Sequence, residues 1–213
     1  MYFFNVAPCP TLQQVLENFV PTVCLVKQSQ NFESQPKEET AMKINEAIAL
    51  CRECGQTGGS LIAYAQSLVS QNMTYSYTNS FDLPHKAFEK GRGYCWQQAS
   101  ILNELLKKCG FKSRMVYCTK NSFPPKVYDG VALPQMVSGH VWCRVFCDGQ
   151  EGDVCPGNPN NRFGSAHFKP LAPVKNWNAF VCFFSYWGSA AVNHARFCKI
   201  QKQKGKVTNK ATL

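Results

Sequence analysis

The spacing of apolar residues changes along the chain, and each spacing predicts a different kind of element. Apolar positions three and four residues apart predict helices over residues 41–51 and 60–72. The same spacing follows Cys95, and Gly110 is well placed to end this third helix. These segments predict a group of helices in the first half of the chain.

A two-residue period predicts strands in the second half. In residues 140–147 one face holds only valine and cysteine, and Asp148-Gly149 predicts a tight hairpin turn directly afterwards. Further strands are predicted at residues 114–118, 151–155 and 177–187, and a long loop of the kind that carries function at residues 121–138. These segments predict a group of strands in the second half of the chain.

Polarity divides the chain into three segments. Residues 1–40 hold a short amphipathic stretch and a polar run with Pro36, which predict an extension and a linker. Residues 41–194 contain the periodic elements and predict one domain. Residues 195–213 have six basic side chains and no acidic one, and predict a disordered tail.

Charge and cysteine content narrow the class of protein. The net charge is +10, but no aromatic-rich motif accompanies the basic tail, so we do not expect nucleic-acid binding. Twelve cysteines would suggest disulfides in a secreted protein. The N-terminus has no secretory pattern and many cysteines lie in apolar runs, so we expect free thiols in the cytoplasm. No apolar stretch is long enough to span a membrane.

Cys95 and His140 form the candidate site. Cys95 stands at the predicted start of a helix, where unpaired N–H groups and the helix dipole stabilise a thiolate. Gly91 and Gly93 permit a tight turn before it. His140 opens a predicted strand and is the candidate base. Either residue alone is more often structural, but together and in this order they predict nucleophilic thiol chemistry.

Two segments resemble a known family. GRGYCWQQASILNELLKKCGFKSRMVY resembles the nucleophile segment of the transglutaminase-like superfamily, and SGHVWCRVF resembles its histidine segment. The resemblance implies an α+β, papain-like core in residues 41–194, with the helix of Cys95 packed on an antiparallel sheet. It also implies acyl transfer or hydrolysis at a peptide or carboxamide bond through a thioester, with no cofactor or metal. Protease, deamidase and transglutaminase activity are not distinguished.

The third catalytic position departs from the family pattern. The family usually has aspartate directly before a proline on the return strand, where this chain has Cys155-Pro156. We predict that Asp153 orients His140, and Asn158 is the alternative. A tight turn places Asp153 about four residues out of register, or roughly 13 Å away, so this prediction requires a bulge at Gly152.

Two other classes of protein stay open. A catalytically inactive binding module becomes the better interpretation if neither Asp153 nor Asn158 contacts His140. A zinc-stabilised structural protein would use Cys51 and Cys54, but a second such pair is missing. We expect the remaining histidines to be structural: His85, His167 and His194.

Overall fold

The computed structural model describes residues 42–128 and 131–211, so the predicted extension of residues 1–40 lies outside the described residues. The helices are α2 (Ile44–Glu53), α3 (Gly58–Asn72), α4 (Pro84–Glu89), α5 (Cys95–Lys108) and α6 (Ala179–Ala211). The strands are β1 (Thr74–Tyr75), β2 (Arg92–Gly93), β3 (Lys112–Phe123), β4 (Lys126–Tyr128), β5 (Val131–Leu133), β6 (Met136–Cys147), β7 (Gln150–Val154), β8 (Lys169–Pro170) and β9 (Lys175–Asn176).

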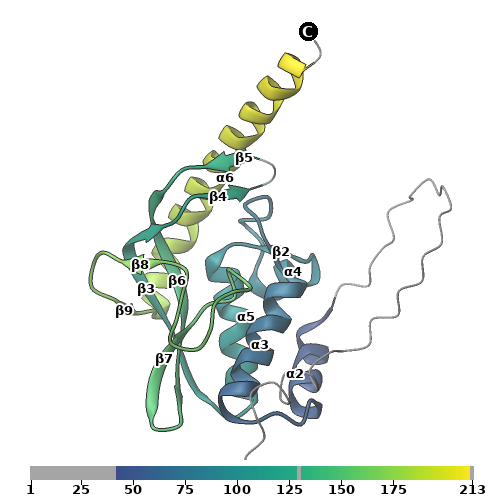
Figure 1. Ribbon diagram of the computed structural model, residues 1–213, viewed down its shortest axis with the longest axis vertical. Coiled ribbons are helices and arrows are strands. Elements are labelled where there is room, and N and C mark those ends of the chain that lie inside the picture. The colour runs from purple at the N-terminus through teal and green to yellow at the C-terminus, as the bar shows by residue number, and fades with distance from the viewer. Residues whose placement is uncertain (1–41, 129–130, 212–213) are drawn as a thin grey trace, which may run out of the picture. The chain divides into compact units, whose positions relative to one another are not determined.

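An antiparallel sheet forms the centre of the fold, with β6 between β7 and β3, and with β8 and β9 paired to β3. Helices α2 to α5 gather on one side of this sheet (Figure 1). Helix α5 contacts both β3 and β6, so the helix that begins at Cys95 lies directly against the sheet. The predicted α+β class, with a helix packed on an antiparallel sheet, is confirmed.

Helix α5 is fixed by its apolar face and by its end. Ala99, Leu102 and Leu105 are fully buried, and burying each of the leucines contributes about 1.5–3 kcal/mol. Just beyond the helix, Gly110 has a φ of 90°, a conformation that glycine adopts without steric cost. The predicted helix and its stop are therefore both present.

Strand β6 is buried on both faces around its middle. The predicted apolar face packs into the main core with the helices, with Cys143 and Val145 fully buried. On the other face Trp142 is also fully buried, in a second cluster with Phe123 and Phe168. The sequence predicts the first face, whereas the segment that carries Phe168 covers the second.

The strand is longer than the sequence predicts. We expected His140 to open it, but β6 begins at Met136, and the ladder with β3 continues past a bulge between Cys118 and Asn121. The predicted loop of residues 121–138 is accordingly wrong in large part. Its residues instead complete β3, form the hairpin of β4 and β5, and start β6.

The C-terminal segment is a helix. We predicted a buried strand at residues 177–187 and disorder after residue 194, but α6 runs from Ala179 to Ala211. A short apolar run does not distinguish a strand from a helix, which explains the error. Ala190 and Ile200 lie buried ten residues apart, so the helix packs on the core beyond the predicted domain end. Its far end extends past β4 and β5 (Figure 1).

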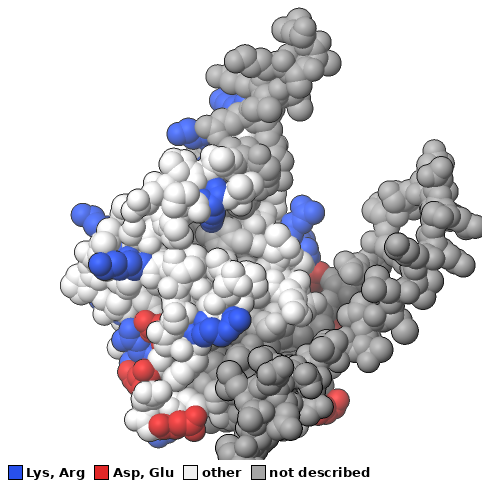
Figure 2. Space-filling view, in the orientation of Figure 1, with Lys and Arg blue, Asp and Glu red and all other residues white. Residues whose placement is uncertain are grey.

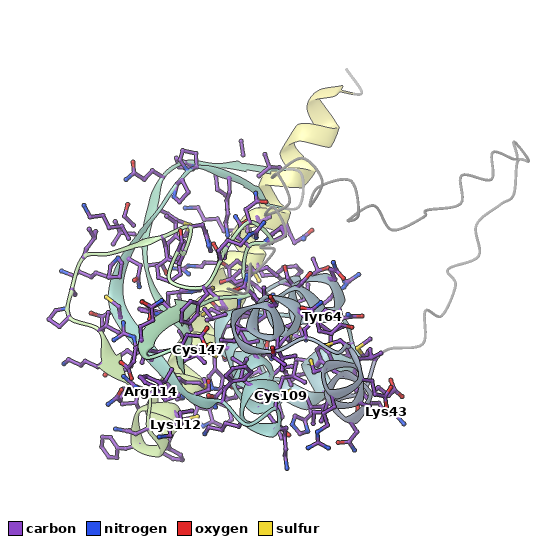
Figure 3. The ribbon with its side chains drawn as sticks, turned by 60° about the horizontal axis from the view of Figure 1, so that its bottom comes forward. Lys43, Tyr64, Cys109, Lys112, Arg114 and Cys147 are labelled. Atoms are coloured by element: carbon purple, nitrogen blue, oxygen red, sulfur yellow. The ribbon has the colours of Figure 1, made fainter. Side chains whose placement is uncertain are left out.

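The ten cysteines within the described residues are all unbridged. Cys109 lies among the helices, whereas Lys112 and Arg114 lie at the sheet (Figure 3). In the part of the chain that the structure describes, no three His, Cys, Asp or Glu side chains group closely enough to hold a metal ion. Among the same described residues, no helix is both long enough and apolar enough to cross a bilayer.

Candidate active site

Cys95 and His140, the predicted nucleophile and base, line one pocket of about 340 Å³. Cys95 is the first residue of α5, and His140 lies in β6. The pocket is closed on another side by α6, which contributes Val192, Asn193 and Arg196. Three elements that are distant in sequence therefore meet around the thiol.

The start of α5 is held by side-chain hydrogen bonds. The Tyr94 N–H donates to Gln97 Oε1 at 3.0 Å, and Gln97 Nε2 donates to the carbonyls of Asn79 and Asp82 at 3.0 and 2.7 Å. A Cβ at Gly93 would lie 2.2 Å from Met73 Cε and 3.0 Å from Gln97 Oε1. A side chain at this position would therefore have to displace the buried Met73 methyl group and the Gln97 side chain that holds the start of the helix.

Opposing effects act on the thiol of Cys95. Burial raises its pKa, whereas hydrogen bonds from the backbone of Val141 and Trp96 and the charge of Arg196 lower it. A hydrogen bond with the side chain of Tyr75 lowers it further, and the net pKa stays above the ordinary value. The resting thiol is therefore protonated, but donors already surround the position of a thiolate. The sequence analysis did not identify Tyr75 or Arg196.

His140 is a buried, neutral imidazole. Its ring lies 4.5 Å from the ring of Phe168 and 5.2 Å from that of Phe123, measured between centroids. Burial, followed by repulsion from His167 when that ring is protonated and from the Lys126 ammonium, lowers its pKa to about 3. A neutral ring can accept a proton from Cys95, but the resting pair is not an ion pair at neutral pH.

Asp153 does not contact His140, and this prediction was wrong. Arg144 Nε and Nη2 donate to the Asp153 carboxylate at 2.7 and 3.2 Å, and the two residues are register partners. The register of β6 and β7 runs through Gly152 without a bulge, and the Phe163 ring occupies the space that a Cβ would need there. The glycine serves packing instead of a shift in register.

The alternative, Asn158, does not contact His140 either. Its side-chain oxygen accepts a hydrogen bond from the Asn160 N–H at 2.9 Å. The absence of both contacts is the outcome that favours an inactive binding module. Neither of the two residues considered for the third position occupies it.

Cys155 occupies that position. Its Sγ lies 3.3 Å from His140 Nε2, and burial raises its pKa to about 12. It is therefore a neutral thiol at physiological pH. The sequence did contain the indication, since Cys155-Pro156 stands where the family places Asp-Pro, but Asp153 is acidic and lies nearby, which favoured it as the prediction.

His167 also lies closer to the site than the sequence suggested. Its ring centroid is 6.4 Å from that of His140. Its Nδ1 is within hydrogen-bonding distance of the Asn161 side chain, and burial lowers its pKa to about 4. Nothing in the spacing of the sequence identifies this histidine, because a folded loop places it there.

A half-buried cysteine at a helix N-terminus, in one pocket with a histidine from a neighbouring antiparallel strand, defines a papain-like thiol site. The family model described as the transglutaminase-like superfamily matches residues 48–152, which include Cys95 and His140. Through this segment the chain belongs to the transglutaminase-like superfamily. Membership supports a cysteine-dependent activity in general terms.

The solved structures that resemble the chain share only 13–15% of its sequence. A candidate protease from Parabacteroides distasonis is 13% identical with a TM-score of 0.39, over 62% of this chain and 26% of that one. A TGase is 15% identical with a TM-score of 0.40, over 70% of this chain and 39% of that one. A candidate cysteine protease from Cytophaga hutchinsonii is 14% identical with a TM-score of 0.40, over 65% of this chain and 50% of that one. The chain thus spans at most half of these proteins, and no curated protein matches it.

Proposed function

We propose that the protein forms a thioester between Cys95 and the acyl group of a peptide or carboxamide, with His140 as the general base. The observation that carries this proposal is that both side chains line one pocket although they lie 45 positions apart in the sequence, on different elements. The chemistry requires no cofactor. Water or an amine would then take the acyl group.

The proton and electron balance follows from the neutral pair. His140 takes the thiol proton as sulfur attacks the carbonyl carbon, and the carbonyl oxygen becomes negative. The backbone N–H groups of Val141 and Trp96 and the Tyr75 hydroxyl are the nearby donors that can stabilise developing charge. The intermediate collapses to the thioester, and the departing amine takes the proton from His140.

In this proposal Cys155 is a weak substitute for an acid. An imidazole with its proton on Nε2 donates to the Cys155 sulfur and leaves Nδ1 free to act as the base. Sulfur is a poor acceptor and the thiol is uncharged, so the imidazolium formed during attack gains little stabilisation. We therefore expect slow acylation compared with a Cys-His-Asp site.

The lack of an acidic partner for His140 favours a second candidate function, a binding module that has lost its acyl chemistry. Neither Asp153 nor Asn158 orients His140, and the site rests as a neutral thiol beside a neutral imidazole. In that case the pocket would hold an amide-containing ligand without attacking it.

An activated acyl donor separates the two functions. We expect p-nitrophenyl acetate to release a burst of p-nitrophenolate and to leave an acetyl group on Cys95, located by peptide mass mapping. Cys95→Ala should abolish the burst, and His140→Gln should slow it about 100-fold or more. Cys198→Ala, which removes an exposed thiol outside the pocket, is the matched control and should behave as the unchanged protein. Acylation of Cys95 no faster than that of N-acetylcysteine would favour the binding module.

A further inference from the structure

We propose that the pocket contains a subsite for a small carboxylate, formed by Arg196 of α6 and Lys126 of β4, so that the acyl substrate is an acidic peptide or amide. This inference rests on the proposed function and names the substrate class for the same site. It depends on two cations, 70 positions apart in the sequence, that the fold places beside the catalytic pair.

The position of Arg196 is fixed by strand β6. Its Nη2 donates to Ser138 Oγ at 3.0 Å, and Ser138 lies two residues before His140, on the same face of the strand. The guanidinium is close enough to Cys95 to lower the pKa of the thiol. A guanidinium has five N–H donors, and the Ser138 bond uses one of them. Arg196 can therefore bind a group of the substrate while Cys95 is attacking.

A smaller recess of about 30 Å³ opens beside the main pocket. Arg196, Lys126, His140 and His167 are among its lining residues. The Lys126 ammonium lies 4.7 Å from the centre of the Tyr75 ring. The recess admits a group the size of a carboxylate, whereas the acyl chain itself would occupy the larger pocket.

Electrostatics favour an anion in this recess. Burial and then the charge of Arg196 act on Lys126 to lower the pKa of its ammonium, so two like charges are held near each other. A carboxylate between them would offset that repulsion and form charge-assisted hydrogen bonds. All residues that line the pocket and the recess are described, and none of them is an aspartate or glutamate.

The surface near the pocket has the same sign of charge. In Figure 2 the upper part of the visible face, over α6 and the β4–β5 hairpin, carries Lys and Arg, whereas Asp and Glu appear only lower down. Together with a net charge of +10, this distribution would increase the encounter rate with acidic substrates. The arrangement is poorly suited to a positively charged acyl donor.

A pair of alkylating agents tests the subsite without knowledge of the substrate. Iodoacetate and iodoacetamide differ by one carboxylate, and the ratio of their rates at Cys95, followed by peptide mass mapping, cancels any change in the thiolate fraction. We expect the ratio of iodoacetate to iodoacetamide to exceed that of N-acetylcysteine about tenfold. Arg196→Gln should abolish the preference and Lys126→Gln should reduce it, whereas Arg196→Lys, which retains the charge, should preserve part of it.

The control is Lys199→Gln, which removes one exposed cation from the same helix outside both cavities and should leave the ratio unchanged. A ratio equal to that of N-acetylcysteine, or one that Arg196→Gln does not alter in folded protein, would overturn the subsite. A preserved preference without acylation by p-nitrophenyl acetate would leave the subsite standing and refute the acyl chemistry.

The source of the carboxylate can be resolved by protection of Cys95 from iodoacetamide. Acetyl-Gly-Glu-amide offers a side-chain carboxylate, and acetyl-Gly-Gly offers a C-terminal one. We expect at least one to slow alkylation of Cys95 in an Arg196-dependent manner, compared with acetyl-Gly-Gln-amide as the neutral control. Equal slowing by all three would contradict an anion subsite.

Discussion

At the scale of single residues, the environment of His140 sets what the site can do. Two aromatic rings and the neighbouring positive charges lower the pKa of the imidazole to about 3, and its Nε2 meets the sulfur of Cys155 instead of a carboxylate. Burial raises the pKa of Cys95 at the same time. Between a low histidine pKa and a high cysteine pKa, the protein holds both groups neutral over the physiological range.

We predict that Cys155→Asp activates the site. A carboxylate beside His140 favours the imidazolium and raises the histidine pKa, and the imidazolium then lowers the pKa of Cys95. In the unchanged protein, the rate at which iodoacetamide alkylates Cys95 should increase only as the pH approaches the raised pKa of the thiol. In the variant the rise should move to lower pH, and the rate at pH 7 should increase about tenfold or more.

Cys155→Ser is the control, because it preserves the size of the side chain and adds no charge. Its pH profile should stay close to that of the unchanged protein. A folded Cys155→Asp protein, checked by circular dichroism, whose Cys95 profile did not move would show that residue 155 has no influence on the pair.

At the scale of elements, the entry into α5 determines where the thiol lies. The capping bonds of Gln97 and the close packing at Gly93 hold the first turn of the helix in one place. The periodicity of α5 is evident in the sequence, and so is its stop at Gly110. The residue that packs against Gly93 is not evident in the sequence, since Met73 belongs to the end of another helix.

We predict that Gly93→Ala destabilises the fold by about 1–3 kcal/mol and slows acylation of Cys95, because the new methyl group must displace Met73 and Gln97. Chemical denaturation and the p-nitrophenolate burst measure the two effects. Gly59→Ala in α3 is the matched control, since a Cβ there meets nothing within 4 Å and alanine favours a helix. An equal loss of stability in both variants would contradict the role of Gly93.

At the scale of the whole molecule, the C-terminal helix belongs to the site. Arg196 lines the pocket and Ile200 is only 5% exposed, although both lie in the segment that the charge run predicted to be a disordered tail. Basic residues on a helix do not prevent docking when one face retains apolar side chains. The functional domain therefore extends beyond residue 194.

We predict that a chain ending at Cys198 loses about 1.5–3 kcal/mol of stability, because it lacks the buried side chain of Ile200. A chain ending at Lys202 retains that contact and should keep most of the stability and the reactivity of Cys95. Thermal unfolding measures the stability of the two truncated chains, and the p-nitrophenolate burst measures the reactivity of Cys95 in each. If the two truncated chains were equally stable, Ile200 would not contribute to docking of the helix.

The sequence by itself determined the α+β class, through its resemblance to a family, and Cys95 and His140 as candidates. It also determined the helix that begins at Cys95 with its stop, the apolar face of β6 and the turn at Asp148-Gly149. These last features depend on local periodicity, capping and turn chemistry, which neighbouring residues encode. The tertiary structure decided what surrounds the pair: Cys155 in place of Asp153, Tyr75 at the thiol, and Arg196 and Lys126 at the recess. These contacts join segments far apart in the chain, and sheet register, loop packing and helix docking set their positions, so no local pattern in the sequence specifies them.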